Sequence, residues 1–352
     1  MESPLAPDSP QHGLRPIVSI CIANYNGIGM LDGCIKSVRS QDCEFPIEII
    51  VHDDASSDGS VDHIRERHPD VLLIESPENV GFCVANNRMA AAASGEYLLL
   101  LNNDAELFPD ALRALFAEAK NTPKPAILGL PQFDFDTGEL IDRGSLVDLF
   151  LNPVPNLDAS RRDVAMIMGS CLWIPRDLWI DLDGFPEWFG SIAEDLHLCS
   201  KARVKDYPVR VLDQSGYRHR VGQSFGGGKI TGSGGLVTTT VRRAYTERNK
   251  TYSLVITTPT ALLCVILPLH LFLLHLEGLL LALFKRDATL FRDIYGPLLP
   301  SLWRQRARIS NDRFKLQAER QISLMTFLAP IQFLPYKLLM LYRHGLPKVQ
   351  NN

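Results

Sequence analysis

Short apolar runs alternate with amphipathic stretches through the first 130 residues. Each apolar run is rich in β-branched residues or leucine and has the length of a buried parallel strand. The strands predicted in this way are Ile17–Ala23, Ile47–Val51, Val71–Ile74, Tyr97–Leu101 and Ala126–Leu130. Helices are predicted between them: one up to about Ser40, one capped by Asp58 and running to about His68, then Gly81–Ala93 and Pro109–Lys120. This rhythm predicts an α/β fold with a mostly parallel sheet and helices on both faces.

The pattern loosens after this point and then resumes. Residues 131–165 are interpreted as a looser insertion, followed by a strand over Met166–Ile174 and a helix over Glu194–Asp206. Gly222–Gly235 contains seven glycines in fourteen residues, which is typical of a mobile loop. Gln223 and Ser224 lie at the start of this loop.

Polar side chains gather where three predicted strands end. These residues are Asn24 and Asn26, Asp53 and Asp54, and Asn102, Asn103 and Asp104. In open α/β sheets, ligands bind beyond the carboxyl ends of the strands, and those ends converge in space. The pattern therefore predicts a binding site at this edge of the sheet.

The C-terminal third has a different character. Ser253–Leu276 contains no Asp, Glu, Lys or Arg and is long enough to span a bilayer. Pro268 interrupts it, so a pair of membrane-surface helices broken near Pro268 is the first interpretation. A spanning or re-entrant segment and a buried soluble helix are the alternatives. Ile322–Tyr342 is a second apolar stretch, and residues 303–320 between the two are strongly basic.

Charge divides the chain at the same place. Residues 1–241 carry 20 Lys and Arg against 34 Asp and Glu, whereas residues 242–352 carry 16 against 6. The 46% hydrophobic content excludes disorder for most of the chain. Because the basic residues alternate with apolar stretches, we expect an anionic membrane surface and not nucleic acid as the partner. The seven scattered cysteines form no CxxC pair and are expected to be reduced.

The first residues lack the basic and apolar segments of a signal peptide. A cleavable signal peptide is therefore not expected. From the pattern and the charge division, we predict a flexible N-terminus over 1–15, a catalytic domain over 16–241 and a membrane-associated helical tail over 242–352.

Five motifs stand in an order that resembles glycosyltransferase family 2. They are SICIANYNG, IIVHDDASSDGS, ENVGFCVANNRMAAAASGEYLLLLNNDAEL, GSCLWIPRDLWIDLDGFPEWF and AEDLHLCSKARVKDYPVRVLDQSGYRHRVGQS. The resemblance covers roughly residues 17–250 and is greatest to the branch containing rhamnosyltransferases. It implies the Rossmann-like GT-A fold.

The resemblance also implies a donor site for a pyrimidine nucleoside diphosphate sugar. Asp53 resembles the family's base-binding aspartate, because a carboxylate can accept the N3–H of uracil or thymine. Asp54 supports the same loop, and Asn24 and Asn26 lie where the first strand meets the nucleotide. Arg88 is a candidate for the diphosphate, since its fork of donors suits phosphate.

Asn102, Asn103 and Asp104 stand at the place of the family's DxD metal motif. Asp104 is the expected ligand of Mg²⁺ or Mn²⁺, and Asn102 and Asn103 are assigned to the nucleotide sugar. The first position is Asn102 and not Asp, which departs from the strict pattern. His219 matches the family's late histidine near the metal and would favour Mn²⁺.

The catalytic residues implied by the resemblance are Glu194 and Asp195. Asp195 resembles the family's general base, which removes the proton of the acceptor hydroxyl in an inverting transfer. Glu194 would orient the acceptor. Trp188 precedes the pair and is a candidate wall of the acceptor site.

The expected function is thus inverting, metal-dependent sugar transfer, with dTDP-L-rhamnose as first choice of donor and other dTDP- or UDP-sugars as alternatives. The expected acceptor is a lipid-linked or cell-envelope glycan at the cytoplasmic face of the membrane. A nucleotidyltransferase and a non-catalytic scaffold of the same fold are the rival hypotheses. The sequence does not determine the sugar, the linkage, the metal or the oligomeric state.

Overall fold

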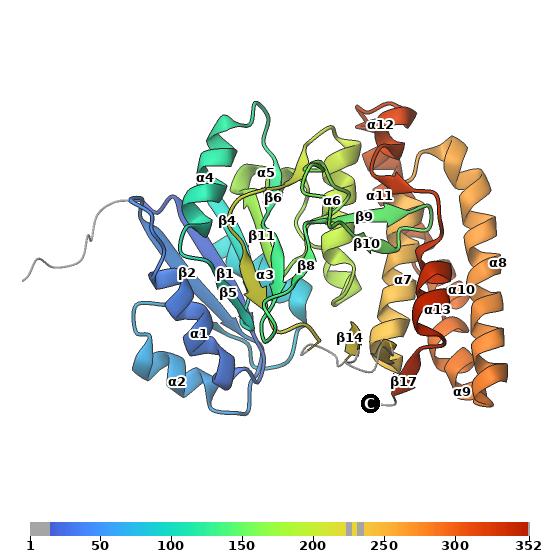
Figure 1. Ribbon diagram of the computed structural model, residues 1–352, viewed down its shortest axis with the longest axis horizontal. Coiled ribbons are helices and arrows are strands. Elements are labelled where there is room, and N and C mark those ends of the chain that lie inside the picture. The colour runs from blue at the N-terminus through green and yellow to red at the C-terminus, as the bar shows by residue number, and fades with distance from the viewer. Residues whose placement is uncertain (1–14, 223–226, 231–235, 351–352) are drawn as a thin grey trace, which may run out of the picture.

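The computed structural model describes residues 15–222, 227–230 and 236–350. Nearly all of the predicted N-terminal segment and much of the glycine-rich loop, including Gln223 and Ser224, therefore lie outside the described residues. Figure 1 shows the sheet and its covering helices on the left and the C-terminal helices on the right.

A seven-stranded sheet forms the centre of the N-terminal region, in the order β12-β6-β11-β4-β1-β2-β3. Its strands are β1 (Val18–Asn24), β2 (Ile47–Asp53), β3 (Leu72–Glu75), β4 (Tyr97–Asn102), β6 (Ile127–Gly129), β11 (Cys171–Pro175) and β12 (Val209–Val211). Neighbouring strands are parallel except at β11, which runs antiparallel to both β4 and β6. The predicted mostly parallel α/β sheet is confirmed.

Helices cover both faces of this sheet. They are α1 (Ile28–Arg39), α2 (Ser60–Arg67), α3 (Phe82–Ala92), α4 (Ala111–Asn121), α5 (Arg176–Asp181), the short 3₁₀ turn η1 (Glu187–Phe189) and α6 (Glu194–Val204). Residues of α1, α2 and α4 share one apolar core, and residues of α3, α5 and α6 share the other. The sheet residues alternate between the two cores because successive side chains of a strand point to opposite faces.

The predicted looser insertion is wrong in detail, because residues 131–165 form short strands. These are β7 (Gln132–Asp134), β8 (Leu140–Asp142), β9 (Ser145–Asp148) and β10 (Pro153–Pro155), while β5 (Ala105–Leu107) and β13 (Tyr217–His219) pair beside β7. The pattern did not show them because each is three or four residues long, and because β7 and β9 also pair with distant strands: β7 with β13, and β9 with β16 (Ile331–Gln332) near the end of the chain. The β9–β10 hairpin thereby joins the tail to the N-terminal region.

The tail is helical, as predicted. Its elements are α7 (Thr240–Thr257), α8 (Thr260–Lys285), α9 (Ala288–Leu290), the π-helical η2 (Phe291–Tyr295), α10 (Leu298–Arg304), α11 (Arg306–Ala318), α12 (Leu324–Leu328) and α13 (Tyr336–His344), with β14 (Gly227–Ile230), β15 (Leu236–Thr239) and β17 (Lys348–Gln350) forming a small sheet.

The predicted helix break near Pro268 is wrong. Helix α8 continues through Pro268, and the break lies at Thr258-Pro259, where Thr258 is extended with ψ 132°. A residue before proline avoids the helical conformation, and this ends α7. Arg313 and Gln317 of α11 donate hydrogen bonds to the last carbonyl groups of α7, so part of the basic segment serves the fold.

Buried charges join α7, α8 and α13. Lys250 donates to Glu247 at 2.7 Å and to Asn152 of the β9–β10 hairpin at 2.6 Å. Lys337 bridges Glu247 and Glu277 at 2.6 and 2.8 Å. Burial alone would raise the pKa of Glu247, but the charges of Lys250 and Lys337 outweigh burial and lower that pKa. We call Glu247, Lys250, Glu277 and Lys337 the tail ion cluster.

Candidate active site

Three predicted donor-site residues meet at the carboxyl edge of the sheet. The parallel register places Asn24 opposite Asp53, and Ala23 opposite Asn102. Asn24 Nδ2 donates to Asp53 Oδ2 at 2.8 Å, and Asn103 Nδ2 donates to Asn24 Oδ1 at 2.7 Å. Ser56 N donates to the other oxygen of Asp53 at 2.9 Å. We call Asn24, Asp53, Ser56 and Asn103 the strand-edge network.

Three other residues predicted for the nucleotide-sugar site lie around this network. The side chain of Asn26 is exposed, and its Oδ1 accepts from Ser57 N at 2.8 Å. The carboxylate of Asp54 accepts from Val80 N and Gly81 N, so it fixes the loop that leads into α3. Arg88 is exposed on α3 and donates to Ser76 Oγ at 3.2 Å.

The two predicted metal ligands also come together. Asp104 Oδ1 lies 3.1 Å from His219 Nε2, and Asn102 Nδ2 lies 3.4 Å from the same nitrogen. The antiparallel pairing of β13 with β5 produces this contact by placing His219 opposite Ala105. On its other side, Nδ1 of His219 lies 3.2 Å from Gln132 Nε2.

These residues fit a divalent ion. Asn102 Oδ1 is buried and has no hydrogen-bond partner among the described residues, so it offers an oxygen ligand beside Asp104. Ligation through His219 Nε2 requires the Gln132 amide to turn its oxygen towards Nδ1–H. Tyr217, which now donates to Gln132 Oε1, can follow this turn because Ser170 Oγ is its second partner at 2.8 Å.

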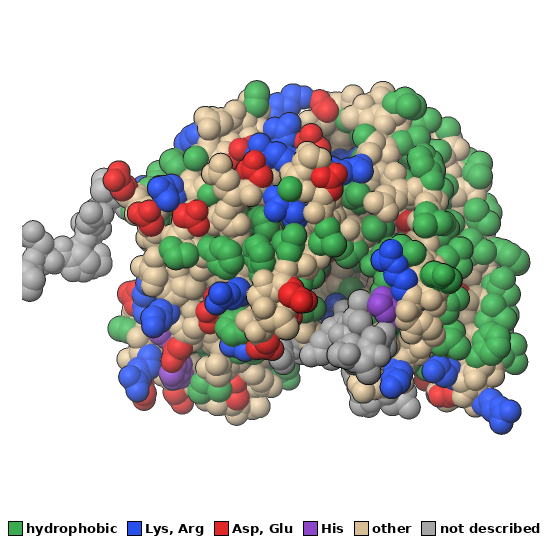
Figure 2. Space-filling view, viewed as in Figure 1, with side chains coloured by type: hydrophobic (Ala, Val, Ile, Leu, Met, Phe, Trp, Pro, Cys, Tyr) green, Lys and Arg blue, Asp and Glu red, His purple; other side chains and the backbone are tan. Residues whose placement is uncertain are grey.

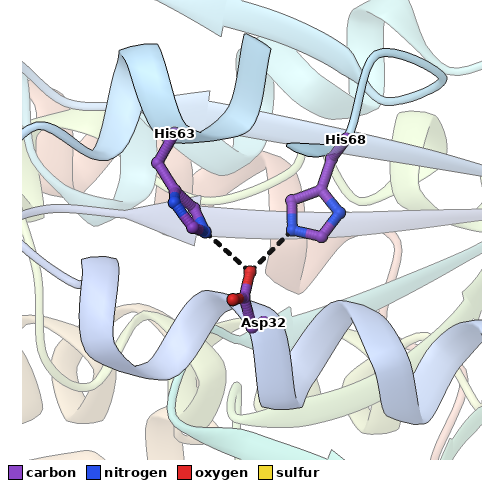
Figure 3. Close-up of side chains that lie close together, drawn as sticks. All are labelled: Asp32, His63 and His68. Atoms are coloured by element: carbon purple, nitrogen blue, oxygen red, sulfur yellow. Dashed lines mark hydrogen bonds and ion pairs between the residues drawn. The ribbon is translucent and has the colours of Figure 1, made fainter. Parts of the chain in front are cut away.

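A second cluster of possible ligands lies between α1 and α2. Figure 3 shows His63 and His68 pointing at Asp32, with nitrogen to oxygen distances of 2.7 and 2.8 Å. The possible ligand atoms of these three side chains all lie within 4.8 Å of one another, so the described part of the chain offers them as a candidate metal site. However, Arg39 Nη1 lies 2.9 Å from His68 Nδ1. Arginine can only donate, so His68 Nε2 carries its proton towards Asp32 and has no lone pair for a metal.

The predicted catalytic carboxylates stand in the first turn of α6. Asp195 Oδ2 accepts from Gly169 N at 3.0 Å and Oδ1 accepts from Leu196 N at 2.7 Å. Glu194 is buried, and its Oε2 has no hydrogen-bond partner among the described residues. Burial raises the pKa of Glu194 to about 8, and the nearby charge of Asp195 adds to the rise.

The two carboxyl groups are therefore unequal. Burial raises the pKa of Asp195 too, but the N–H groups of Gly169 and Leu196 and the charge of Arg242 oppose the rise. Burial thus favours the protonated form of Glu194 near neutral pH, whereas the two N–H donors and Arg242 favour the ionised form of Asp195. Environments that separate the pKa values of two neighbouring acids assign them different chemical roles.

A strained loop presents this pair. In the segment Phe189–Ala193, which we call the base loop, Gly190, Ile192 and Ala193 have φ values of 76°, 68° and 66°. Positive φ at a β-branched residue such as Ile192 costs roughly 1–3 kcal/mol and persists only where the surroundings impose it. Trp188 lies just before the loop and is partly exposed, with its ring packed 4.8 Å from Tyr252 and Arg308 above it.

The carboxylate pair and the metal motif are adjacent. Gly169 binds Asp195, and the next residue, Ser170, accepts a hydrogen bond from Asn102 N at 3.0 Å. A pocket of about 280 Å³ lined by Arg15, Glu96 and Arg176 opens elsewhere, at the amino ends of the strands. The candidate site is therefore the open edge between Asp53, Asp104 and Asp195, and not that pocket.

Comparison with known proteins identifies the domain that builds this edge. Residues 19–181 match the model of the family described as glycosyl transferase family 2. The chain carries a glycosyl transferase family 2 domain. The family and enzyme class predicted from the motifs are confirmed for this domain.

Curated relatives of the family 2 domain are distant. The N-acetylglucosaminyl-diphospho-decaprenol L-rhamnosyltransferase of Mycobacterium tuberculosis is 25% identical over 185 residues, which cover 44% of this chain and 60% of the relative. The putative glycosyltransferase EpsH of Bacillus subtilis is 29% identical over 36% of this chain and 37% of its own length.

Solved structures share the fold of the family 2 domain. The mannosyltransferase PcManGT from Pyrobaculum calidifontis, solved with GDP-Man and Mn²⁺, covers 91% of this chain and 88% of its own, with a TM-score of 0.51 and 18% identity. GalNAc-T7, solved with UDP, GalNAc and Mn²⁺, has a TM-score of 0.51 and 17% identity over 58% of this chain and 43% of its own. The predicted GT-A fold is confirmed.

Sequence reasoning missed several residues of the site. Gln132 lies in the segment interpreted as an insertion, and Arg242 lies at the assigned start of the tail. Tyr25 has its ring 55% exposed beside Asn26, and the NYNG motif could have revealed it. Asn249 of α7 contacts the base loop from far along the sequence, and no local pattern indicates this contact.

Proposed function

We propose that the protein is an inverting glycosyltransferase that moves a sugar from a pyrimidine nucleoside diphosphate to a hydroxyl of a lipid-linked acceptor. The observation that carries the proposal is the meeting of three groups at one edge of the sheet: the Asn24–Asp53 pair, the Asp104–His219 pair and the Asp195 carboxylate. Asp195 accepts the proton of the acceptor hydroxyl, and protonated Glu194 can donate a hydrogen bond to the acceptor sugar. Trp188 offers the partly exposed ring against which that sugar packs.

The donor is held at the strand-edge network. Asp53 accepts the N3–H of the base, and the exposed rim of Tyr25 and Asn26 gives the base and ribose a surface to contact. Asp54 keeps the neighbouring loop in place. Arg88 is the candidate donor to the phosphates. Asp104, Asn102 and His219 would hold a divalent ion, which would supply positive charge to offset the charge of the departing nucleoside diphosphate.

L-rhamnose is the first choice of sugar, because the Mycobacterium tuberculosis relative is an L-rhamnosyltransferase by its name. The same name contains a diphospho-decaprenol group, and this supports a lipid-linked acceptor. A panel of donors tests the first assignment, and a polyprenyl-diphosphate sugar offered as acceptor tests the second.

Helix α8 supports action at a membrane. Among the described residues it is the helix that is long and apolar enough to cross a bilayer. Only 22% of its most apolar window is buried in the protein, so most of that window is exposed. The buried side chains form one stripe: Ile266, His270, Leu274, Gly278 and Leu281. Much of the remaining surface is apolar and exposed, and Figure 2 shows it as the green right-hand edge of the molecule. Its most exposed side chains are Val265, Phe272, Leu283 and Phe284.

We assign α8 to the membrane surface and not to a transmembrane span. Glu277 on the protein side of the helix is paired with Lys337 and with Arg243. Crossing the bilayer would carry the tail ion cluster into hydrocarbon, which is costly. Lying in the interface instead buries the apolar face and leaves Lys285 and Arg286 at its end for anionic headgroups. The cytoplasmic side stays a prediction.

The proposed activity is tested with dTDP-L-rhamnose, UDP-sugars and GDP-mannose, each with Mg²⁺ or Mn²⁺, by nucleotide release with a polyprenyl-diphosphate sugar as acceptor. Asp195→Asn should lower turnover by roughly 10²–10⁴-fold and leave donor binding unchanged. Asp177→Asn, an exposed acid in the first turn of α5, is the matched control. Near-normal turnover of the Asp195 variant would contradict the base assignment. Donor binding without transfer by the wild type would favour a scaffold.

The membrane assignment is tested by flotation with vesicles containing anionic lipid. Phe272→Glu on the exposed face of α8 should weaken vesicle binding about 10-fold, since burying a phenylalanine side chain contributes roughly 1.5–3 kcal/mol. Leu72→Glu, an exposed leucine on β3, should leave it unchanged. Equal flotation of both variants would exclude α8 as the contact.

A further inference from the structure

The amide of Asn249 on α7 contacts the base loop through three hydrogen bonds. Its Nδ2 donates to the carbonyl oxygens of Phe189, Ser191 and Ile192 at 3.1, 2.9 and 2.8 Å. Asn249 is completely buried. These contacts join the tail to the segment that immediately precedes Glu194 and Asp195.

The orientation of this amide is fixed by chemistry. Arg248 Nε donates to Asn249 Oδ1 at 2.9 Å, and an arginine cannot accept. The oxygen of the amide must therefore face Arg248, and its NH₂ group must face the three carbonyl groups. Arg248 also donates through Nη2 to the carbonyl oxygen of Phe189 at 3.0 Å, which adds a second support from the same helix.

The supported backbone is the strained one. Ile192 and Ala193 have positive φ, and the three accepting carbonyl groups belong to the residues just before and within this turn. The base loop also contacts α3, because the carbonyl oxygen of Gly190 accepts from Cys83 N at 3.1 Å. Without the amide of Asn249, the three carbonyl groups would each lose a donor, and those of Ser191 and Ile192, next to the strained residues, would lose the side-chain donor that the structure gives them.

We propose that Asn249 is a positioning residue that acts through Asp195: it holds the base loop so that the carboxylate faces the acceptor. The inference rests on the proposed function, in which Asp195 is the base. It makes helix α7 part of the catalytic machinery and not only a link to the membrane-facing helices. A small displacement of a catalytic group can lower the rate about 100-fold without affecting the binding of a distant ligand.

The test is Asn249→Asp, which keeps the shape of the side chain but removes both donors. We expect turnover per donor-binding site to fall about 100-fold. The dissociation constant for dTDP or UDP with Mn²⁺ should stay within about twofold, because the strand-edge network makes no contact with Asn249 that the structure records. Amide hydrogen exchange over residues 189–196 should become faster. Asn311→Asp, the same change at an exposed position of α11, is the matched control.

A purely structural role gives a different result. In that case the number of donor-binding sites falls together with turnover, and turnover per site stays at the wild-type value; this overturns the proposal, as does unchanged turnover. If Asn249→Asp does not fold, Arg248→Leu removes the second support at a partly exposed position and should lower turnover per site about 10-fold. No decrease per site in that variant also overturns the proposal.

Failure of the proposed function is distinguishable from failure of this inference. If the wild-type protein transfers no sugar from any donor, the proposed function is wrong. Hydrogen exchange over residues 189–196 still reports whether Asn249 holds the loop. If the wild type transfers sugar but amide hydrogen exchange over residues 189–196 is unchanged in Asn249→Asp, the proposed function stands and the role of Asn249 is wrong.

Discussion

The proposed donor edge and the proposed acceptor edge of the candidate site are built in different ways. The strand-edge network takes Asn24, Asp53, Ser56 and Asn103 from the first 103 residues, and the register of parallel strands brings them together. The base loop is contacted by Cys83 and Asn249, and the carboxylate of Asp195 that follows it is bound by Gly169, so three separate parts of the chain contribute. The donor edge is thus set by strand order, whereas the acceptor edge depends on docking of the tail.

Each of the two edges suits one of the two proposed substrates. A soluble nucleotide sugar needs only a rigid strand edge. A lipid-linked acceptor must be met at the membrane, and the helix that holds the base loop, α7, is followed directly by α8 with its exposed apolar face. The loop that precedes the proposed base, Asp195, and the proposed membrane surface therefore both contact the same helical unit.

The largest expected effect comes from undocking the tail. Lys250→Met removes one charge of the tail ion cluster and leaves Glu247 and Asn152 without that partner. The free energy of unfolding should fall by about 3–5 kcal/mol, the usual cost of breaking a buried ion pair. Chemical denaturation measures this fall.

Lys120→Met is the control for that variant. Lys120 forms an exposed pair with Glu96 at 3.0 Å, and such pairs contribute about 0–1 kcal/mol. A loss below 1 kcal/mol in the Lys250 variant would show that the cluster does not dock the tail.

The donor edge can be broken separately with Gly27→Ala. A Cβ atom at Gly27 would overlap Asn103 Nδ2 and Asn24 Oδ1, so the hydrogen bond between these side chains must break. Losing one or two hydrogen bonds of about 0.5–1.5 kcal/mol each should weaken dTDP or UDP binding about 10- to 100-fold. Calorimetry measures the binding.

Gly29→Ala, two residues away, is the matched control. A Cβ atom there meets nothing within 4 Å, and alanine favours the helix. Its nucleotide affinity should equal that of the wild type. Equal weakening in both variants would place the effect in α1 and not in the strand-edge network.

The pH dependence of stability tests whether Glu194, at the proposed acceptor edge, is protonated in the fold. Glu194 has a pKa of about 8 in the fold against 4.5 as a reference, so between these values the native state holds a proton that the unfolded chain has released. The contribution of Glu194 to stability is complete below pH 4.5 and is lost as the pH rises towards 8. Glutamine mimics the protonated form and lacks this dependence.

Glu194→Gln should therefore gain stability relative to the wild type by about 1.4 kcal/mol for each pH unit between 5 and 8. Denaturation at pH 5, 6.5 and 8 measures the difference. Glu139→Gln, at an exposed glutamate, should show no such trend. A constant difference between Glu194→Gln and the wild type would mean that Glu194 is ionised in the fold.

Much of the fold could be predicted, and the reason differs between elements. Ile17–Ala23 and Tyr97–Leu101 are apolar on both faces, so their pattern identifies central strands without reference to other segments. Residues 145–155 could not be assigned, because β9 and β10 are four and three residues long and the second partner of β9 is the two-residue strand β16 near the end of the chain. The helix break was misplaced at Pro268 because composition gives each proline the same weight, whereas the packing of α7 places the turn at Pro259.

The sequence by itself determined the α/β class, the polar strand ends, the two acids at the start of α6 and the contrast between an acidic catalytic part and a basic, apolar tail. These follow from local periodicity and residue type. The tertiary structure alone buries Glu194 while two N–H groups bind Asp195, brings Asn249 against the base loop, and turns one stripe of α8 inward. Such features depend on burial and on contacts between distant segments, and local patterns contain no record of either.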